Sequence, residues 1–191
     1  MIKALDTYYD GKMFRSRLEA RWAVFFDLCG VIYEYEPGGF DLGNGLKYLP
    51  DFLLHNVVFN HAGYSRGNDL YVEVKGYMDK LSAEKIKVFS KEYPVLVVTE
   101  LPKSDDLWSL VDELENFKVI NDVTPYNFET VDGDYFGAYP GIDLDGDFNL
   151  FGADSTYLDS MDVKPTILAY RKARCKRFDH GDQLIKEMQS F

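Results

Sequence analysis

The sequence predicts a mixed α/β fold with one main core, in the order helix, strands, helix, strand, helix. Large apolar side chains recur at helical spacing over residues 13–29, and short β-branched and aromatic runs separated by turn residues follow them. A run at 95–99 that is apolar up to Thr99 then lies between two further helical segments. With 191 residues, 46% of them hydrophobic, the chain is long and apolar enough to bury such a core.

The helices of this core are expected at residues 13–29, 81–93 and 105–117. In the first of them Trp22 and Phe26 lie on one apolar face, and Gly30 is a suitable end because glycine commonly follows the last helical residue.

The expected strands are short runs rich in β-branched and aromatic residues. They are residues 31–35, 40–42, 46–54, 70–76 and 95–99. Pro37 to Gly39 separates the first strand from the second. Gly43 to Gly45 turns the second strand into the third as a hairpin, because asparagine and glycine tolerate positive φ. Residues 56–69 have no predicted regular structure.

Charge is distributed unevenly along the chain. Residues 121–162 hold ten acids and no Lys or Arg, which leaves 22 acids against 21 bases elsewhere, so the formal net charge of −11 belongs to this segment. Asp132-Gly133 and Asp145-Gly146 are hairpin turn signals. A small acidic β-hairpin appendage is therefore expected at 121–162, attached to a core formed by residues 1–120.

The C-terminal part is basic. Residues 164–177 hold six bases and no acid, and a helix is expected over 165–178 because proline suits a first helical turn. This basic helix, within a C-terminal segment 163–191, is expected to pack on the core. One face toward nucleic acid and another turned away would account for such an asymmetry.

Composition also excludes some classes of protein. No apolar run approaches the ~18 residues of a membrane helix, and residues 1–12 contain no apolar stretch of signal-peptide type. Cys29 and Cys175 form no disulfide or metal-binding pattern. We therefore expect no membrane partner and a reducing, cytoplasmic setting.

The strand at 70–76 contains the residues best suited to chemistry. Side chains alternate across a strand, so Leu70, Val72 and Val74 share the face that can pack under the first helix. Glu73 and Lys75 share the other face, ~7 Å apart along the strand. The carboxylate can bind a hard divalent cation. The ammonium group can orient or help deprotonate an attacking water, or stabilise charge on a phosphate.

Asp51 supplies a second carboxylate, at the end of the hairpin strand expected to pair with residues 70–76. Mg²⁺ takes one or two carboxylates and keeps several waters, one of which can become a nucleophile. The Val74 carbonyl would point into the same site as a further ligand. Glu19, beside the apolar face of the first helix, could reach this metal or a second one.

Each of these residues also has an ordinary structural explanation. A lone Glu-x-Lys on a strand is usually its wet face, and aspartate after proline is usually a turn residue. Glu19 could simply pair with Arg15 one helical turn earlier. The combination of a helical acid, Pro50-Asp51 and Glu73-Val74-Lys75 in this order of elements is more specific than any one of its members.

These residues match a known signature. Pro50-Asp51 and Glu73-Val74-Lys75 resemble the motif of the PD-(D/E)xK nuclease superfamily, and residues 14–42, 48–52, 71–76 and 169–181 resemble a group of its small phage and bacterial members. The resemblance implies a restriction-endonuclease-like α/β sandwich core (αβββαβ), dependence on Mg²⁺ or Mn²⁺, and DNA as the substrate. It also implies the host cytoplasm, if a phage encodes the chain. Members often dimerise, and the sequence leaves a homodimer open.

The sequence-based hypothesis is a metal-dependent DNA endonuclease. Asp51, Glu73, Lys75 and Glu19 would be catalytic, and Asp51, Glu73, Val74 and Glu19 would bind the metal. The expected DNA-binding residues are basic side chains of the N-terminal region and the C-terminal helix: Arg15, Arg17, Arg171, Lys172, Arg174 and Arg177.

Three alternatives remain at this stage. The chain could be a catalytically inactive nuclease-fold protein that binds or inhibits a protein partner through its acidic segment, or a DNA mimic. Asp143, Asp145 and Asp147 could bind calcium, although their spacing does not fit an EF-hand loop.

Overall fold

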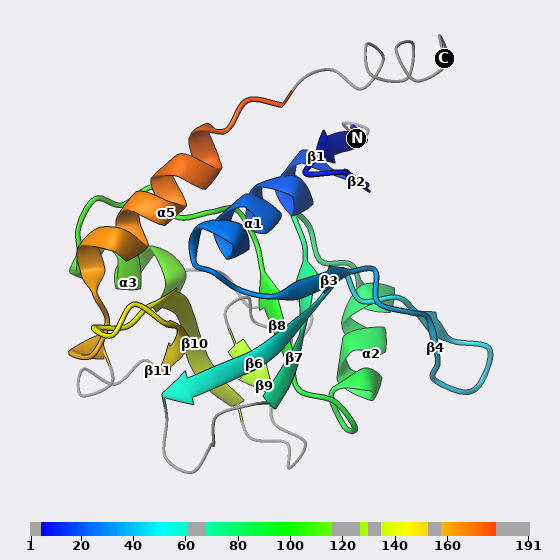
Figure 1. The fold of residues 1–191 in the computed structure, drawn as a ribbon. Helices are drawn as coiled ribbons and strands as arrows, with labels where there is room; N and C mark the ends of the chain where they lie inside the picture. The colour runs from blue at the N-terminus through cyan, green and yellow to red at the C-terminus, as the bar shows by residue number, and fades with distance from the viewer. Residues whose placement is uncertain (1–4, 61–67, 116–126, 130–134, 153–157, 179–191) are drawn as a thin grey trace, which may run out of the picture.

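The computed structural model describes residues 5–60, 68–115, 127–129, 135–152 and 158–178 (Figure 1). Within these residues the helices are α1 (Arg17–Leu28), α2 (Lys80–Phe89), α3 (Leu107–Glu115) and α5 (Val163–Cys175). The strands are β1 (Thr7–Tyr9), β2 (Lys12–Phe14), β3 (Tyr33–Tyr35), β4 (Phe40–Asp41), β5 (Lys47–Tyr48), β6 (Phe52–Asn60), β7 (Asn68–Val74), β8 (Val95–Val98), β9 (Asn127–Glu129), β10 (Tyr135–Ile142) and β11 (Phe148–Gly152). The predicted mixed α/β class is confirmed.

A seven-stranded sheet in the order β11-β10-β9-β8-β7-β6-β3 forms the centre of the molecule. β7 and β8 are parallel, which requires the intervening α2 as a crossover, and β6 is antiparallel to β7. β11 also pairs with the last residues of β6, so the strands from β6 to β11 close into a ring. In the described residues, no helix is long and apolar enough to cross a membrane.

Helices cover the two faces of this sheet unequally. α1 and α5 pack side by side on one face, where the rings of Phe25 and Tyr170 stack with their centroids 4.2 Å apart (Figure 1). α2 lies on the other face, where Phe89 packs against Tyr48 and Tyr71. The side chains of β7 therefore face two different cores, as the predicted alternation requires.

α1 begins later than the sequence pattern predicts. Lys12–Phe14 forms β2, antiparallel to β1, and Ser16 is the N-cap of the helix. Trp22, Phe25 and Phe26 are fully buried, so the predicted apolar face is confirmed. The Trp22 indole N–H donates to the carbonyl of Thr99 at 2.7 Å, which fastens α1 to the end of β8.

The predicted hairpin is present but shorter. β4 and β5 pair around the turn at Gly43–Gly45, and Asn44 has the expected positive φ of 52°. The strand predicted at 46–54 is interrupted at Pro50 and Asp51, because proline has no N–H to donate to a ladder. β6 then continues to Asn60, into a segment for which the sequence predicted no structure.

The prediction of a separate acidic hairpin appendage at 121–162 is wrong for the described residues. β9 pairs with β8, and β10 pairs with β9 and β11, so these strands extend the central sheet. The turn predicted at Asp145-Gly146 is confirmed between β10 and β11. The turn predicted at Asp132-Gly133 lies outside the described residues. Local turn signals identified the hairpin, but the long-range pairing that joins it to the core leaves no local pattern.

Candidate active site

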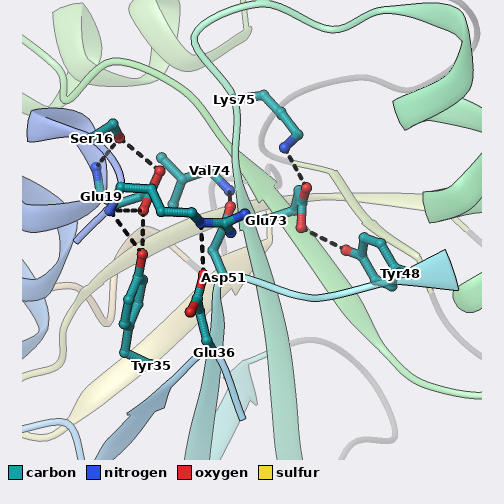
Figure 2. Close-up of polar contacts among 10 residues, drawn as sticks. Ser16, Glu19, Tyr35, Glu36, Tyr48, Asp51, Glu73, Val74 and Lys75 are labelled. Atoms are coloured by element: carbon teal, nitrogen blue, oxygen red, sulfur yellow. Dashed lines mark hydrogen bonds and ion pairs between the residues drawn. The ribbon is translucent and has the colours of Figure 1, made fainter. Parts of the chain in front are cut away.

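Asp51 lies at the junction between β5 and β6, directly beside β7. Its side chain is only 2% exposed, and its Oδ2 atom accepts a 2.7 Å hydrogen bond from the backbone N–H of Val74 (Figure 2). The antiparallel pairing of Phe52 with Val72 produces this contact, because it places the residue before β6 next to the end of β7. Asp51 and the Glu73-Val74-Lys75 segment are thus brought together as the sequence predicted.

Glu73 is also buried, at 3% exposure, and its two carboxylate oxygens have different partners. The ammonium group of Lys75 lies 2.5 Å from Oε1, and the hydroxyl of Tyr48 donates to Oε2 at 2.7 Å (Figure 2). The wet-face explanation of Glu-x-Lys therefore does not hold for Glu73. Tyr48 was not among the predicted site residues, because nothing local indicates where a strand tyrosine directs its hydroxyl.

Arg15, which was predicted to bind DNA, is paired with Asp51 and Glu36. Its guanidinium lies 2.6 Å from Asp51 and 2.7 Å from Glu36, and its side chain is 52% exposed. The pair thus joins a hydrated guanidinium to a buried carboxylate, and Asp51 would need another cationic partner if Arg15 moved away.

Glu19 has a structural role in this arrangement. Its Oε1 atom accepts from the Ser16 hydroxyl at 2.8 Å, and Oε2 accepts from the Tyr35 hydroxyl at 2.7 Å and the Arg15 N–H at 3.1 Å. The Ser16 hydroxyl accepts in turn from the Glu19 N–H. The sequence Ser16-x-x-Glu19 has the form of a capping box. The prediction of Glu19 as a metal ligand did not take this pattern into account. Arg15 does meet Glu19, but through its backbone.

The negative charge around Asp51 exceeds the positive charge of its partners. Burial and the charges of Glu73 and Glu19 raise the pKa of Asp51 from 3.8 to about 7, against the opposing effects of Lys75 and the Val74 N–H. In the view of Figure 2 Asp51 lies between the Glu19 cluster and the Glu73–Lys75 pair. The acids thus form one electrostatic group that lacks positive charge.

The neighbouring groups respond in the expected directions. Burial lowers the pKa of Lys75, but the charges of Glu73 and Asp51 outweigh this effect and raise it overall, so Lys75 is positively charged at neutral pH. Burial, and next the charge of Glu73, raise the pKa of Tyr48 well above its ordinary value. Tyr48 is therefore a neutral hydrogen-bond donor at this site.

The donor set fits a hard divalent cation. Asp51 and Glu73 are oxygen donors from adjacent segments, and burial and then the charge of Glu73 raise the pKa of Asp51, so a bound cation would favour its ionised form. No three Asp, Glu, His or Cys side chains of the described residues form a ready metal-binding group. Two carboxylates with a backbone carbonyl and waters would suffice for Mg²⁺. Val74 contacts Asp51 through its N–H, so a role for its carbonyl remains a prediction.

A cavity of about 570 Å³ opens beside Glu73 and Lys75, whereas Asp51 is not among its lining residues. Its lining includes Glu73, Lys75, Tyr48 and Arg15, together with residues of the β4–β5 hairpin and of α2. The carboxylate of Glu73 is therefore buried, but the Glu73–Lys75 pair is accessible from the cavity.

The predicted DNA-binding residues of the C-terminal helix lie elsewhere. Arg171 pairs with Asp105 at 2.6 Å, and Arg174 donates to the carbonyl of Pro102. Lys172 and Arg177 are exposed. α5 covers the α1 face of the sheet, whereas Glu73 faces the α2 side. Contact of these bases with DNA stays a prediction.

The structure also shows the surroundings of Asp143, a possible calcium ligand, and of Arg17, a predicted DNA contact. Asp143 accepts the backbone N–H groups of Asp145 and Asp147 on Oδ1 and the amide of Asn149 on Oδ2. Its oxygens thus stabilise the β10–β11 turn, as in an ordinary Asx turn. Arg17 is exposed at the first position of α1 and stays a predicted DNA contact.

The comparisons with known proteins add no family assignment. No protein-family model matches the chain, and no match is found among the curated proteins or the solved structures.

Proposed function

We propose that the protein is a divalent-metal-dependent nuclease that hydrolyses DNA phosphodiester bonds, with Mg²⁺ or Mn²⁺ as the ion. One observation carries the proposal. Asp51 and Glu73, 22 residues apart in sequence, are both buried at the same point of the sheet, with Lys75 bonded to Glu73. Buried carboxylates that lack full compensation are costly, so a site of this kind favours a bound cation.

The residues divide the work by their positions. Asp51, Glu73 and the Val74 carbonyl would hold the ion, which when bound supplies an activated water at neutral pH and offsets phosphate charge. Lys75 is paired with Glu73 and also lines the cavity, so it can donate a hydrogen bond to the attacking water or to a phosphate oxygen. Tyr48 fixes Glu73 by its second oxygen. Glu19 supports the site indirectly, since it holds the backbone of Arg15 and the start of α1.

The arrangement of elements supports the more specific proposal of a restriction-endonuclease-like core. α1 packs on the face of the sheet formed by β6, β7 and β8, and the crossover between β7 and β8 contains α2 on the other face. The acidic residue follows Pro50 before β6, and the Glu-x-Lys pair ends β7. The order helix, strands, helix, strand matches the resemblance stated from sequence.

Cleavage assays test the proposal directly. Wild type should nick supercoiled DNA with Mg²⁺ or Mn²⁺ and not in EDTA. Lys75→Ala should lose activity by about 100-fold or more, the scale on which a donor to developing charge acts. Lys91→Ala is the matched control, because it removes one exposed lysine that does not line the cavity. Circular dichroism checks that each variant is folded.

The outcome separates the nuclease from its main alternative. If wild type binds the ion but leaves supercoiled, linear and branched DNA intact, the nuclease proposal fails. That result favours a nuclease-fold protein that acts by binding a partner.

A further inference from the structure

The cavity beside the candidate site is enriched in basic side chains. It is lined by four bases (Arg15, Lys47, Lys75 and Lys85) and two acids (Asp41 and Glu73). The cavity lining is therefore basic, although the whole chain carries 32 acids and 21 bases. Basic residues collected in a concave surface raise the local concentration of anions.

Lys47 and Lys85 differ from the other two bases. Arg15 is paired with Asp51 and Glu36, and Lys75 is paired with Glu73. Among the described residues, by contrast, Lys47 and Lys85 form no ion pair with any acid. Two ammonium groups are therefore available to an anion without breaking an internal contact.

These two lysines come from two different elements that line the cavity. Lys47 is an exposed residue of β5, in the hairpin that extends from the sheet, and Lys85 is a half-buried residue in the middle of α2 (Figure 1). The Glu73–Lys75 pair lines the same space. An anion that contacts Lys47 and Lys85 would consequently lie against the candidate catalytic residues.

The aromatic side chains of the cavity favour phosphates over bases as the recognised groups. The Phe40 ring packs against Tyr71, Phe89 and Tyr93, and the Tyr48 ring packs against Phe89. Both rings are held in this aromatic cluster, whereas recognition of single strands commonly relies on bases stacking on exposed aromatic rings. Contacts to phosphates alone carry no direct sequence information.

We propose that the cleft between the β4–β5 hairpin and α2 binds the phosphate backbone of duplex DNA without reading its sequence, through Lys47 and Lys85. This inference rests on the proposed nuclease function and names the substrate class of the same site. It differs from the sequence-based expectation, which assigned DNA contacts to α5.

Binding measured without cleavage tests the cleft separately from the nuclease activity. Fluorescence anisotropy in EDTA would use two labelled duplexes of unrelated sequence and one single strand of equal length. The double variant Lys47→Ala/Lys85→Ala should bind both duplexes about tenfold more weakly, and its salt dependence should decrease by about two counterions. The control Lys91→Ala/Lys103→Ala removes the same charge from exposed positions outside the cavity lining. Thermal denaturation checks that both variants remain folded.

Several results would overturn the cleft proposal. Two of them concern the variants: equal losses of duplex affinity in the two double variants, or a loss seen only with Arg171→Ala/Lys172→Ala. Two concern the DNA: a preference for one duplex sequence, or tighter binding of the single strand. The last is competition by inorganic phosphate or a mononucleotide that is as effective as competition by unlabelled duplex. If the cleft binds duplex as expected but no ion supports cleavage, the nuclease proposal fails and the cleft stands. If cleavage occurs with full activity in Lys47→Ala/Lys85→Ala, the nuclease proposal stands and the cleft fails.

Discussion

Replacing Asp51 by asparagine should make the metal-free protein more stable at alkaline pH. The pKa of Asp51 is raised from 3.8 to about 7, so the folded state binds this proton more tightly than the unfolded state does. A carboxyl group with a raised pKa leaves stability highest at low pH. The stability of wild type should therefore fall as pH rises from about 4 to about 7, and stay lower above that range.

The size of the effect follows from the same difference. A pKa about three units above that of a free aspartate corresponds to about 4 kcal/mol at pH 8, at ~1.4 kcal/mol per unit. Asparagine can still accept from the Val74 N–H, but it loses the ion pair with half-exposed Arg15, which offsets at most about 1 kcal/mol. The net stabilisation is about 3 kcal/mol, or about 6–12 °C in Tm for a chain of this size.

The assay is thermal denaturation of wild type and Asp51→Asn in EDTA between pH 4 and pH 8. The two Tm curves should converge toward pH 4, separate progressively as pH rises to about 7, and stay apart above that value. Asp145→Asn, at an exposed position, is the control and should follow wild type throughout. If Asp51→Asn is equal to or less stable than wild type at pH 8, Asp51 is a satisfied structural ion-pair residue and the electrostatic argument for a cation site is refuted.

Three further substitutions test separate parts of the structure. Glu19→Ala should lower stability by about 1–2 kcal/mol in chemical denaturation, with or without metal, because it removes a capping box; a loss that appears only with metal would instead make Glu19 a ligand. Tyr48→Phe should cost about 1 kcal/mol and slow DNA nicking, since Glu73 loses one donor; an unchanged nicking rate would contradict its positioning role. Gly141→Ala should destabilise by about 1–3 kcal/mol, because its Cβ would lie 3.1 Å from Met161; an unchanged Tm would show that the core relaxes there.

The sequence predicted the central part of the site because its signals are local. Strand alternation placed Glu73 and Lys75 on one face, and the antiparallel pairing of neighbouring segments brought Asp51 beside them. The apolar face of α1 was equally predictable from its spacing. In each of these cases the determining residues are within a few positions of one another, or on segments joined by a short connection.

The errors concern contacts between distant segments or signals with two meanings. Nothing local in residues 121–162 shows that β9 pairs with β8, so the acidic strands were expected outside the core. The hydroxyl of Tyr48 meets Glu73 across 25 residues, a contact that no periodicity encodes. Glu19 was interpreted as a ligand although Ser16-x-x-Glu19 also fits a helix cap, whose hydrogen bonds it makes here, so its role as a ligand stays a prediction.

The charge of Asp51 is the feature of this fold that a structural role explains least. The contact it makes with the Val74 N–H needs only an acceptor, which a neutral amide provides without the cost of a buried charge. Arg15, its cationic partner, is half exposed and shared with Glu36, so it compensates the charge weakly. A fold selected for stability alone would favour asparagine at this position, and sites that depart from the stability optimum are commonly functional. In the function proposed above, a cation held by Asp51 and Glu73 would compensate this excess negative charge.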